Sequence, residues 1–264
     1  MLKIDQLYGI LDNLAPFSIS KKLIAQGDYD NSGVLVKCHE EVNKILFSLD
    51  LSVDCVKRAK RLGYDTIITH HPAIYAPISD MDYDGNNACV LLAVKNNINV
   101  ISMHLNLDMA IGGIDQSLAQ SMGANDCEIL QPLEDGVGYG RKFCLEKDLT
   151  LSQLVKTLKT QLNTNKIVVY GSKNNKAYRV ASFCGAGAST VAKIINDKLF
   201  DTQVIVTSDI PHHVIKQIIE SGKAVIVLTH YSAENYGFKK FFSAMQIELN
   251  QLALTEYFED KRFL

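Results

Sequence analysis

The chain has 264 residues, 47% of them hydrophobic and 21% charged, and its formal net charge at pH 7 is −2. This length suits one large α/β domain or two compact lobes, and the composition argues against a long disordered region. The net charge gives no electrostatic reason to expect binding to nucleic acid or an anionic membrane, which favours a small-molecule or protein partner, and we expect a small-molecule substrate. No CxxC pair or membrane-length apolar stretch is present, so we expect a cytoplasmic protein.

The first half of the chain alternates helical and extended patterns. Apolar residues recur at helical spacing over residues 4–11, and Pro16 ends the helix that they predict. An apolar run at 44–49 predicts a strand, and the segment 52–62 predicts a helix that Gly63 caps. This order is a strand followed by a helix.

The same alternation continues through the chain. Further apolar runs rich in β-branched residues lie at 66–69, 100–103, 180–183, 204–207 and 225–229. Near-continuous apolar strands separated by helices are typical of an α/β protein with largely parallel sheets covered on both faces. The weakest pattern covers residues 131–178, so we expect two lobes, 1–130 and 131–264, with interleaving of the two allowed.

Six of the seven histidines follow the end of a predicted strand. They are His70, His71, His104, His212, His213 and His230. In open α/β sheets the carboxyl ends of the strands border one crevice, so residues distant in sequence can converge there. This positional bias is the main sign of a functional site.

Two of these histidines precede a carboxylate by four residues. His104 and Asp108 form one such pair, and His230 and Glu234 form the other, with a spacing that places both members on one face of a helix. Carboxylates that bridge two cations hold them about 3.5–4 Å apart in paired-metal sites. Asp108 and Glu234 are our candidates for such bridges.

The adjacent His70 and His71 project in different directions, which favours two ions over one. The predicted ligands are His70, His71, His104, Asp108, His230 and Glu234. Imidazole and carboxylate ligands without thiolate suit two divalent transition metal ions and do not distinguish among zinc, iron, manganese and cobalt.

Other polar positions carry weaker predictions. His39 is expected to be a core or surface residue, and the turn around Asp30 is expected only to begin a strand. His212 and His213 begin a helix after a proline, where they are either polar caps or groups that reach the site. The glycines in the segment 185–188 either expose backbone N–H groups to an anion or allow a tight turn.

Six short motifs, taken in order, resemble those of a known family, the Nif-three-like proteins. They are DNSG from Asp30, DTIITHHP to Pro72, MHLNLD to Asp108, SFCGAGAS around Gly185, VTSDIPHH to His213 and THYSAE to Glu234. Many bacterial members of that family carry the name GTP cyclohydrolase 1 type 2. The motifs span most of the chain.

The resemblance implies two related α/β lobes with mixed, largely parallel sheets that face a shared metal-binding cleft, often in a hexameric ring. It implies the short form of the family, because the weakly patterned region 131–178 is too short for the domain that some members insert. By position, the family's ligands fall on His70, His71, Asp108, His230 and Glu234, with His104 close to the metals.

These features together favour a dinuclear metal-dependent hydrolase that acts on a nucleotide-like or phosphorylated small molecule. The resemblance suggests ring opening of GTP, and Asp209, His212 and His213 are candidates for the general acid or base. The alternative is a non-enzymatic metal-binding or regulatory oligomer. A third possibility is an interaction module in which the histidines are surface polar residues.

Overall fold

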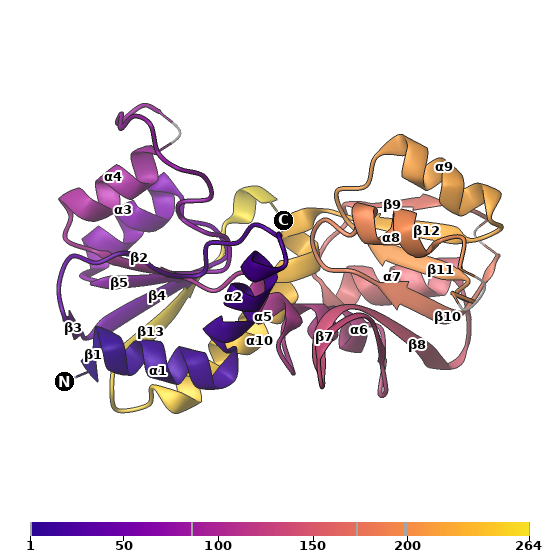
Figure 1. Ribbon diagram of the computed structural model, residues 1–264, viewed down its shortest axis with the longest axis horizontal. Coiled ribbons are helices and arrows are strands. Elements are labelled where there is room, and N and C mark those ends of the chain that lie inside the picture. The colour runs from indigo at the N-terminus through magenta and orange to yellow at the C-terminus, as the bar shows by residue number, and fades with distance from the viewer. Residues whose placement is uncertain (1, 86, 173, 198–199, 264) are drawn as a thin grey trace. The chain divides into compact units, whose positions relative to one another are not determined.

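The computed structural model describes residues 2–85, 87–172, 174–197 and 200–263. The chain divides into two compact units, which interleave along the sequence (Figure 1). Unit 1 consists of Met1–Ala110 and Phe238–Asp260, and unit 2 consists of Ile111–Gly237 and Lys261–Leu264. The boundary expected near residue 131 lies within a strand of unit 2. Both units combine helices with a mixed sheet, which confirms the predicted α/β class.

Unit 1 contains a five-stranded sheet. In spatial order its strands are β13 (Leu254–Phe258), β4 (Lys44–Ser48), β5 (Thr66–Thr69), β6 (Asn99–Ser102) and β2 (Gly33–Val36). The first four are parallel to one another and β2 is antiparallel to β6. Every residue of β5 and β6 is buried, as expected of strands covered on both faces. A separate antiparallel pair joins β1 (Leu2–Lys3) to β3 (Glu41–Val42).

Helices cover both faces of this sheet. They are α1 (Ile4–Leu14), α2 (Phe17–Ala25), α3 (Val53–Leu62), α4 (Ala88–Lys95), α5 (Leu105–Met109) and the C-terminal part of α10 (His230–Glu248). Leu46 and Ile67 contribute to a core with residues of α3 and α4, the helices that cover one face of this sheet (Figure 1). On the other face, the Phe47 ring contacts aromatic rings of α10. As predicted, α3 ends at Gly63, whose φ of 72° is left-handed.

Unit 2 contains a six-stranded sheet. Its spatial order is β7 (Glu128–Glu134), β8 (Val137–Thr150), β10 (Lys176–Ser182), β11 (Val204–Thr207), β12 (Ala224–Leu228) and β9 (Ile167–Tyr170). The neighbours β10, β11 and β12 are parallel, whereas the other three pairings are antiparallel. Most of the antiparallel strand residues come from the weakly patterned region 131–178. Strands that face solvent on one side lack the continuous apolar runs of buried parallel strands.

The helices of unit 2 are α6 (Ile114–Ser121), α7 (Leu151–Gln161), α8 (Ala188–Ile194), α9 (His212–Glu220) and the start of α10, with a short 3-10 helix, η1 (Lys261–Phe263). Phe183, Val191 and Ile205 belong to the core that α8 and α9 form with β10, β11 and β12. Among the described residues, no helix has both the length and the apolar character that crossing a membrane would require.

Candidate metal centre

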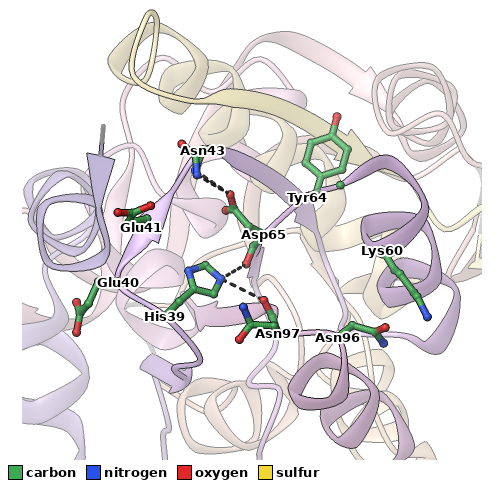
Figure 2. A pocket seen from close by; sticks show the side chains of 10 residues that line it. His39, Glu40, Glu41, Asn43, Lys60, Tyr64, Asp65, Asn96 and Asn97 are labelled. Carbon is green, nitrogen blue, oxygen red and sulfur yellow. Dashed lines mark hydrogen bonds between the residues drawn. The ribbon is translucent and has the colours of Figure 1, made fainter.

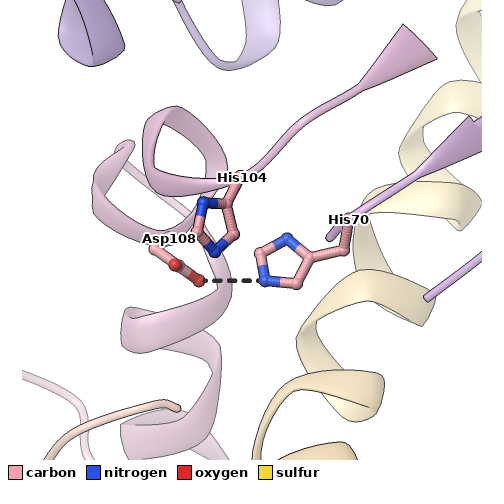
Figure 3. A group of neighbouring side chains, drawn as sticks. All are labelled: His70, His104 and Asp108. Carbon is pink, nitrogen blue, oxygen red and sulfur yellow. Dashed lines mark ion pairs between the residues drawn. The ribbon is translucent and has the colours of Figure 1, made fainter. Parts of the chain in front are cut away.

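In unit 1, three predicted ligands meet at the carboxyl ends of two adjacent strands. His70 directly follows β5. His104 lies two residues after β6 and immediately precedes α5, which places Asp108 one helical turn further on (Figure 3). One potential ligand atom from each of the three lies within 4.8 Å of the other two. His70 and Asp108 are almost fully buried. The group could hold a metal ion.

The hydrogen bonds of His70 fix its tautomer. Its Nδ1 lies 2.8 Å from the carbonyl oxygen of Met103, which can only accept, so Nδ1 carries the proton. In a neutral ring, Nε2 therefore presents its lone pair 3.5 Å from Oδ1 of Asp108. A lone pair and a carboxylate oxygen repel each other unless a cation lies between them. This donor set fits a metal ion.

His104 is held in the same way. Its Nδ1 lies 2.7 Å from Oδ1 of Asp30, and its backbone N–H donates to Oγ of Ser32 at 3.1 Å. Asp30 also accepts from the hydroxyls of Ser20 and Ser32. Burial alone would raise the pKa of Asp30, but the hydrogen bonds from His104 and the two serines outweigh it and lower that pKa. Asp30 therefore faces His104 as a carboxylate at neutral pH.

His71 adds a further imidazole to this group. Its ring centroid lies 4.8 Å from that of His70 and 6.0 Å from that of His104. Its Nδ1 is 2.6 Å from Oδ1 of Asp50, a residue that follows the end of β4. Asp50 thus orients the ring, so that Nε2 is the atom that could bind a metal ion.

In unit 2, His230 and Glu234 lie one turn apart at the start of α10. Nε2 of His230 is 3.0 Å from Oε1 of Glu234, and Nδ1 is 2.5 Å from Oδ2 of Asp209. Asp209 follows β11 and has a φ of 44°, an uncommon conformation for a residue other than glycine. A Cβ on Gly185 would lie 2.5 Å from Oε1 of Glu234, so this turn accepts no larger residue without displacing the carboxylate.

All four histidines share one arrangement. Each places Nδ1 against an oxygen acceptor, which is Met103, Asp50, Asp30 or Asp209. Metal-binding histidines almost always donate their second ring N–H to a carboxylate or carbonyl, which fixes the tautomer and makes the other nitrogen a better ligand. The pattern therefore has the form that metal ligands require.

The sequence did not reveal the residues that orient these rings. It predicted only the start of a strand at Asp30; β2 does begin at Gly33, but Asp30 also binds His104. Asp50 follows an apolar run, the signal used for the histidines, and could have been found by it. Met103 acts through its backbone carbonyl, for which its side chain gives no signal.

The remaining histidines lie elsewhere. His212 and His213 are exposed in the first turn of α9, the helix predicted to begin there. His39 lines a polar hollow of about 640 Å³ at the amino ends of β4, β5 and β6, whereas the ligands of unit 1 follow the carboxyl ends of β5 and β6 (Figure 2). Its Nε2 lies 3.2 and 3.1 Å from the carbonyls of Asp65 and Asn97. This is a structural role.

The fold and these clusters define a class: a two-unit α/β protein whose strands end in histidine and carboxylate groups that could bind metal. Residues 2–261 match the model of the Duf34/NIF3 (NGG1p interacting factor 3) family. The chain belongs to this family, as its motifs predicted.

Similar proteins agree with this assignment. A Clostridium perfringens protein named GTP cyclohydrolase 1 type 2 homolog is 26% identical, covering 88% of this chain and 87% of the relative. A Methanocaldococcus jannaschii protein of the same name is 28% identical, covering 96% and 99%. Among solved structures, a Staphylococcus aureus hypothetical protein superposes with a TM-score of 0.84 at 24% identity, covering 98% of this chain and 97% of the other. A Bacillus cereus protein related to NIF3 also gives 0.84, at 17% identity and the same coverage.

Proposed function

We propose that this protein is a hydrolase that uses two divalent transition metal ions to act on a nucleotide-like or phosphorylated small molecule. The observation that carries the proposal is the orientation of His70, His71, His104 and His230, each held through Nδ1 by an oxygen acceptor. Surface histidines have no need of such uniform support, which argues against a simple interaction module.

We further propose that each unit supplies ligands to the two ions. The pair His230 and Glu234 offers two donors, fewer than the three protein ligands of typical catalytic zinc sites. The group His70, His104 and Asp108 offers three. Asp108 and Glu234 are the carboxylates suited to bridging. Zinc, iron, manganese and cobalt all accept this donor set.

When bound, two such ions would activate a water molecule and polarise the electrophile of the substrate. The protein's own residues keep the ligand rings in place: Asp30, Asp50 and Asp209 each accept an N–H from one of them. Asp209 is thereby better suited to orienting His230 than to proton transfer. The exposed His212 and His213 are then the candidates for general acid or base.

The substrate class is the finer part of this proposal. The name shared by the relatives, GTP cyclohydrolase 1 type 2 homolog, supports testing GTP ring opening first and phosphoesters next. A shared name reflects sequence similarity and not a measured reaction, so the turnover of GTP and of phosphoesters must be measured directly. We also propose a homohexamer, on the basis of the family resemblance, and multi-angle light scattering would test it.

The decisive experiment combines elemental analysis with an activity screen. We expect about two transition ions per chain in the wild type, a count typical of paired-metal hydrolases, and fewer in His70→Ala and Glu234→Ala. His39→Ala is the matched control and should retain the ions, because the hydrogen-bond partners of the His39 ring lie at the amino ends of β5 and β6, opposite to the ends that carry the predicted ligands of unit 1. Two ions without turnover of any nucleotide or phosphoester would identify a metal-binding or regulatory protein.

A further inference from the structure

Two exposed tyrosines lie beside the ligand group of unit 1. The Tyr75 ring meets the His104 ring at 86°, with centroids 6.4 Å apart, and the Tyr29 ring meets Tyr75 at 64° and 5.0 Å. Tyr29 is 50% exposed and Tyr75 is 58% exposed. Single exposed aromatics are common on protein surfaces, but this pair is contiguous with a predicted metal ligand.

Several hydrogen bonds join the segments that carry these rings. The Tyr29 hydroxyl donates to the carbonyl of Tyr75, and the Asn31 amide donates to the carbonyl of Ile74 at 2.6 Å. Between Tyr29 and Asn31, Asp30 binds the imidazole of His104. The Tyr29 ring and the backbone that carries Tyr75 are therefore held in position relative to His104 before anything binds, which lowers the entropic cost of binding against them.

We propose that Tyr29 and Tyr75 form a stacking surface for a planar heteroaromatic ring of the substrate. This inference rests on the proposed function, since it places the ring beside the proposed metal centre. Aromatic side chains stack on such rings whatever their hydrogen-bonding pattern, because each presents a π face.

The charges near Tyr29 and Tyr75 favour a neutral ring over a cationic group as the ligand. Aromatic faces also attract ammonium groups, so a cationic ligand is the main alternative. His104 lies directly beside Tyr75 and is a ligand in the proposed centre, where bound ions would be the largest local positive charges. A cation on the tyrosines would be repelled. A ligand with a neutral ring and an anionic group suits this surface better, because the ring can stack on the tyrosines while the anion is attracted to the metals.

The test measures binding and needs no turnover. Isothermal titration calorimetry of the metal-loaded full chain would compare guanosine monophosphate and uridine monophosphate with ribose 5-phosphate, which has no base. We expect at least one nucleotide to bind at least about fivefold more tightly than ribose 5-phosphate, since stacking on an aromatic residue contributes that much or more.

Variants then locate the effect. Tyr75→Leu and Tyr29→Leu should weaken nucleotide binding by roughly 5- to 100-fold and leave ribose 5-phosphate unchanged. Tyr75→Phe keeps the ring and should bind like the wild type. Tyr83→Leu is the matched control, because Tyr83 is 49% exposed in the same loop but packs under Lys95.

Two results would overturn the inference: nucleotides that bind no better than ribose 5-phosphate, or leucine variants that weaken all three probes equally. Metal content, measured in each variant, should not change. Tighter binding of nucleotides than of ribose 5-phosphate, without hydrolysis of any substrate, would support the stacking surface and reject the hydrolase. Hydrolysis without this preference for nucleotides would support the hydrolase and reject the stacking surface.

Discussion

Asp30 and His104 are 74 residues apart in the sequence, yet Oδ1 of the carboxylate lies 2.7 Å from Nδ1 of the imidazole. The hydrogen bond ties the polar turn before β2 to His104, two residues after the end of β6. It fixes which nitrogen of His104 can bind a metal. A buried carboxylate 74 residues away in the sequence thus orients a predicted metal ligand.

Asp30→Asn tests this control. The substitution removes the charge that stabilises the oriented imidazole, and we expect metal affinity to fall by about 10- to 100-fold, as with other residues that orient metal ligands. Competition with a fluorescent chelator would measure it. Asp28→Asn, at an exposed position in the same segment, is the control and should bind metal like the wild type. Equal affinity in both variants would contradict the role of Asp30.

Gly185 provides a second test, in unit 2. Alanine there would place a methyl group 2.5 Å from Oε1 of Glu234 and would also adopt a φ of +56°. We expect metal affinity to fall by about tenfold or more as the carboxylate moves. Gly222→Ala separates the two effects, because Gly222 has a φ of +81° but nothing within 4 Å of the added carbon. If Gly185→Ala and Gly222→Ala are both less stable but both bind metal like the wild type, the predicted clash with Glu234 does not affect metal binding.

Glu256 should make stability depend on pH. It accepts a hydrogen bond from the Tyr64 hydroxyl at 2.6 Å and one from Nε of Arg58 at 2.8 Å. The Tyr64 hydrogen bond and the Arg58 charge lower the pKa of Glu256 and together exceed the opposing effect of burial. A folded pKa below the unfolded value means that the stabilisation is complete above about pH 4.3 and is lost as the pH falls further.

Urea unfolding of Glu256→Gln at several pH values would measure this effect. At pH 7 we expect the variant to be less stable by about 0.5–1 kcal/mol, since solvent screens a partly exposed ion pair. The difference from the wild type should shrink below about pH 4. Glu248→Gln, at an exposed position, is the control. A difference that stays constant down to pH 3 would rule out the Glu256 carboxylate as its source.

The cysteines should differ in reactivity. Burial raises the pKa of the Cys55 thiol to about 12, and its side chain lies in the core with α3 and α4. The thiolate is the reactive form, so Cys55 should resist iodoacetamide in the folded protein, while the exposed Cys144 reacts first. Peptide mass spectrometry before and after denaturation would show the order. Labelling of Cys55 at the rate of Cys144 in the folded protein would contradict its burial.

The strands that the sequence predicted well are those with continuous apolar runs. β5 and β11 occupy the expected residues, and α3 lies between the Ser52 cap and Gly63. Each of these is encoded within a few neighbouring residues. The edge strand β13 was not predicted, because its residues are exposed or half-buried and form no continuous apolar run. It is defined by its parallel pairing with β4, some 210 residues earlier.

By itself, the sequence determined the α/β class, the family and the histidine and carboxylate types available for metal, because local periodicity and ordered motifs are properties of short segments. Only the tertiary structure decided that Asp30, Asp50, Asp209 and the Met103 carbonyl hold the four imidazoles. It also brought Tyr29 and Tyr75 together beside His104. Hydrogen bonds and ring contacts act over a few ångströms, and the separation of residues along the chain says nothing about which groups folding brings within that range.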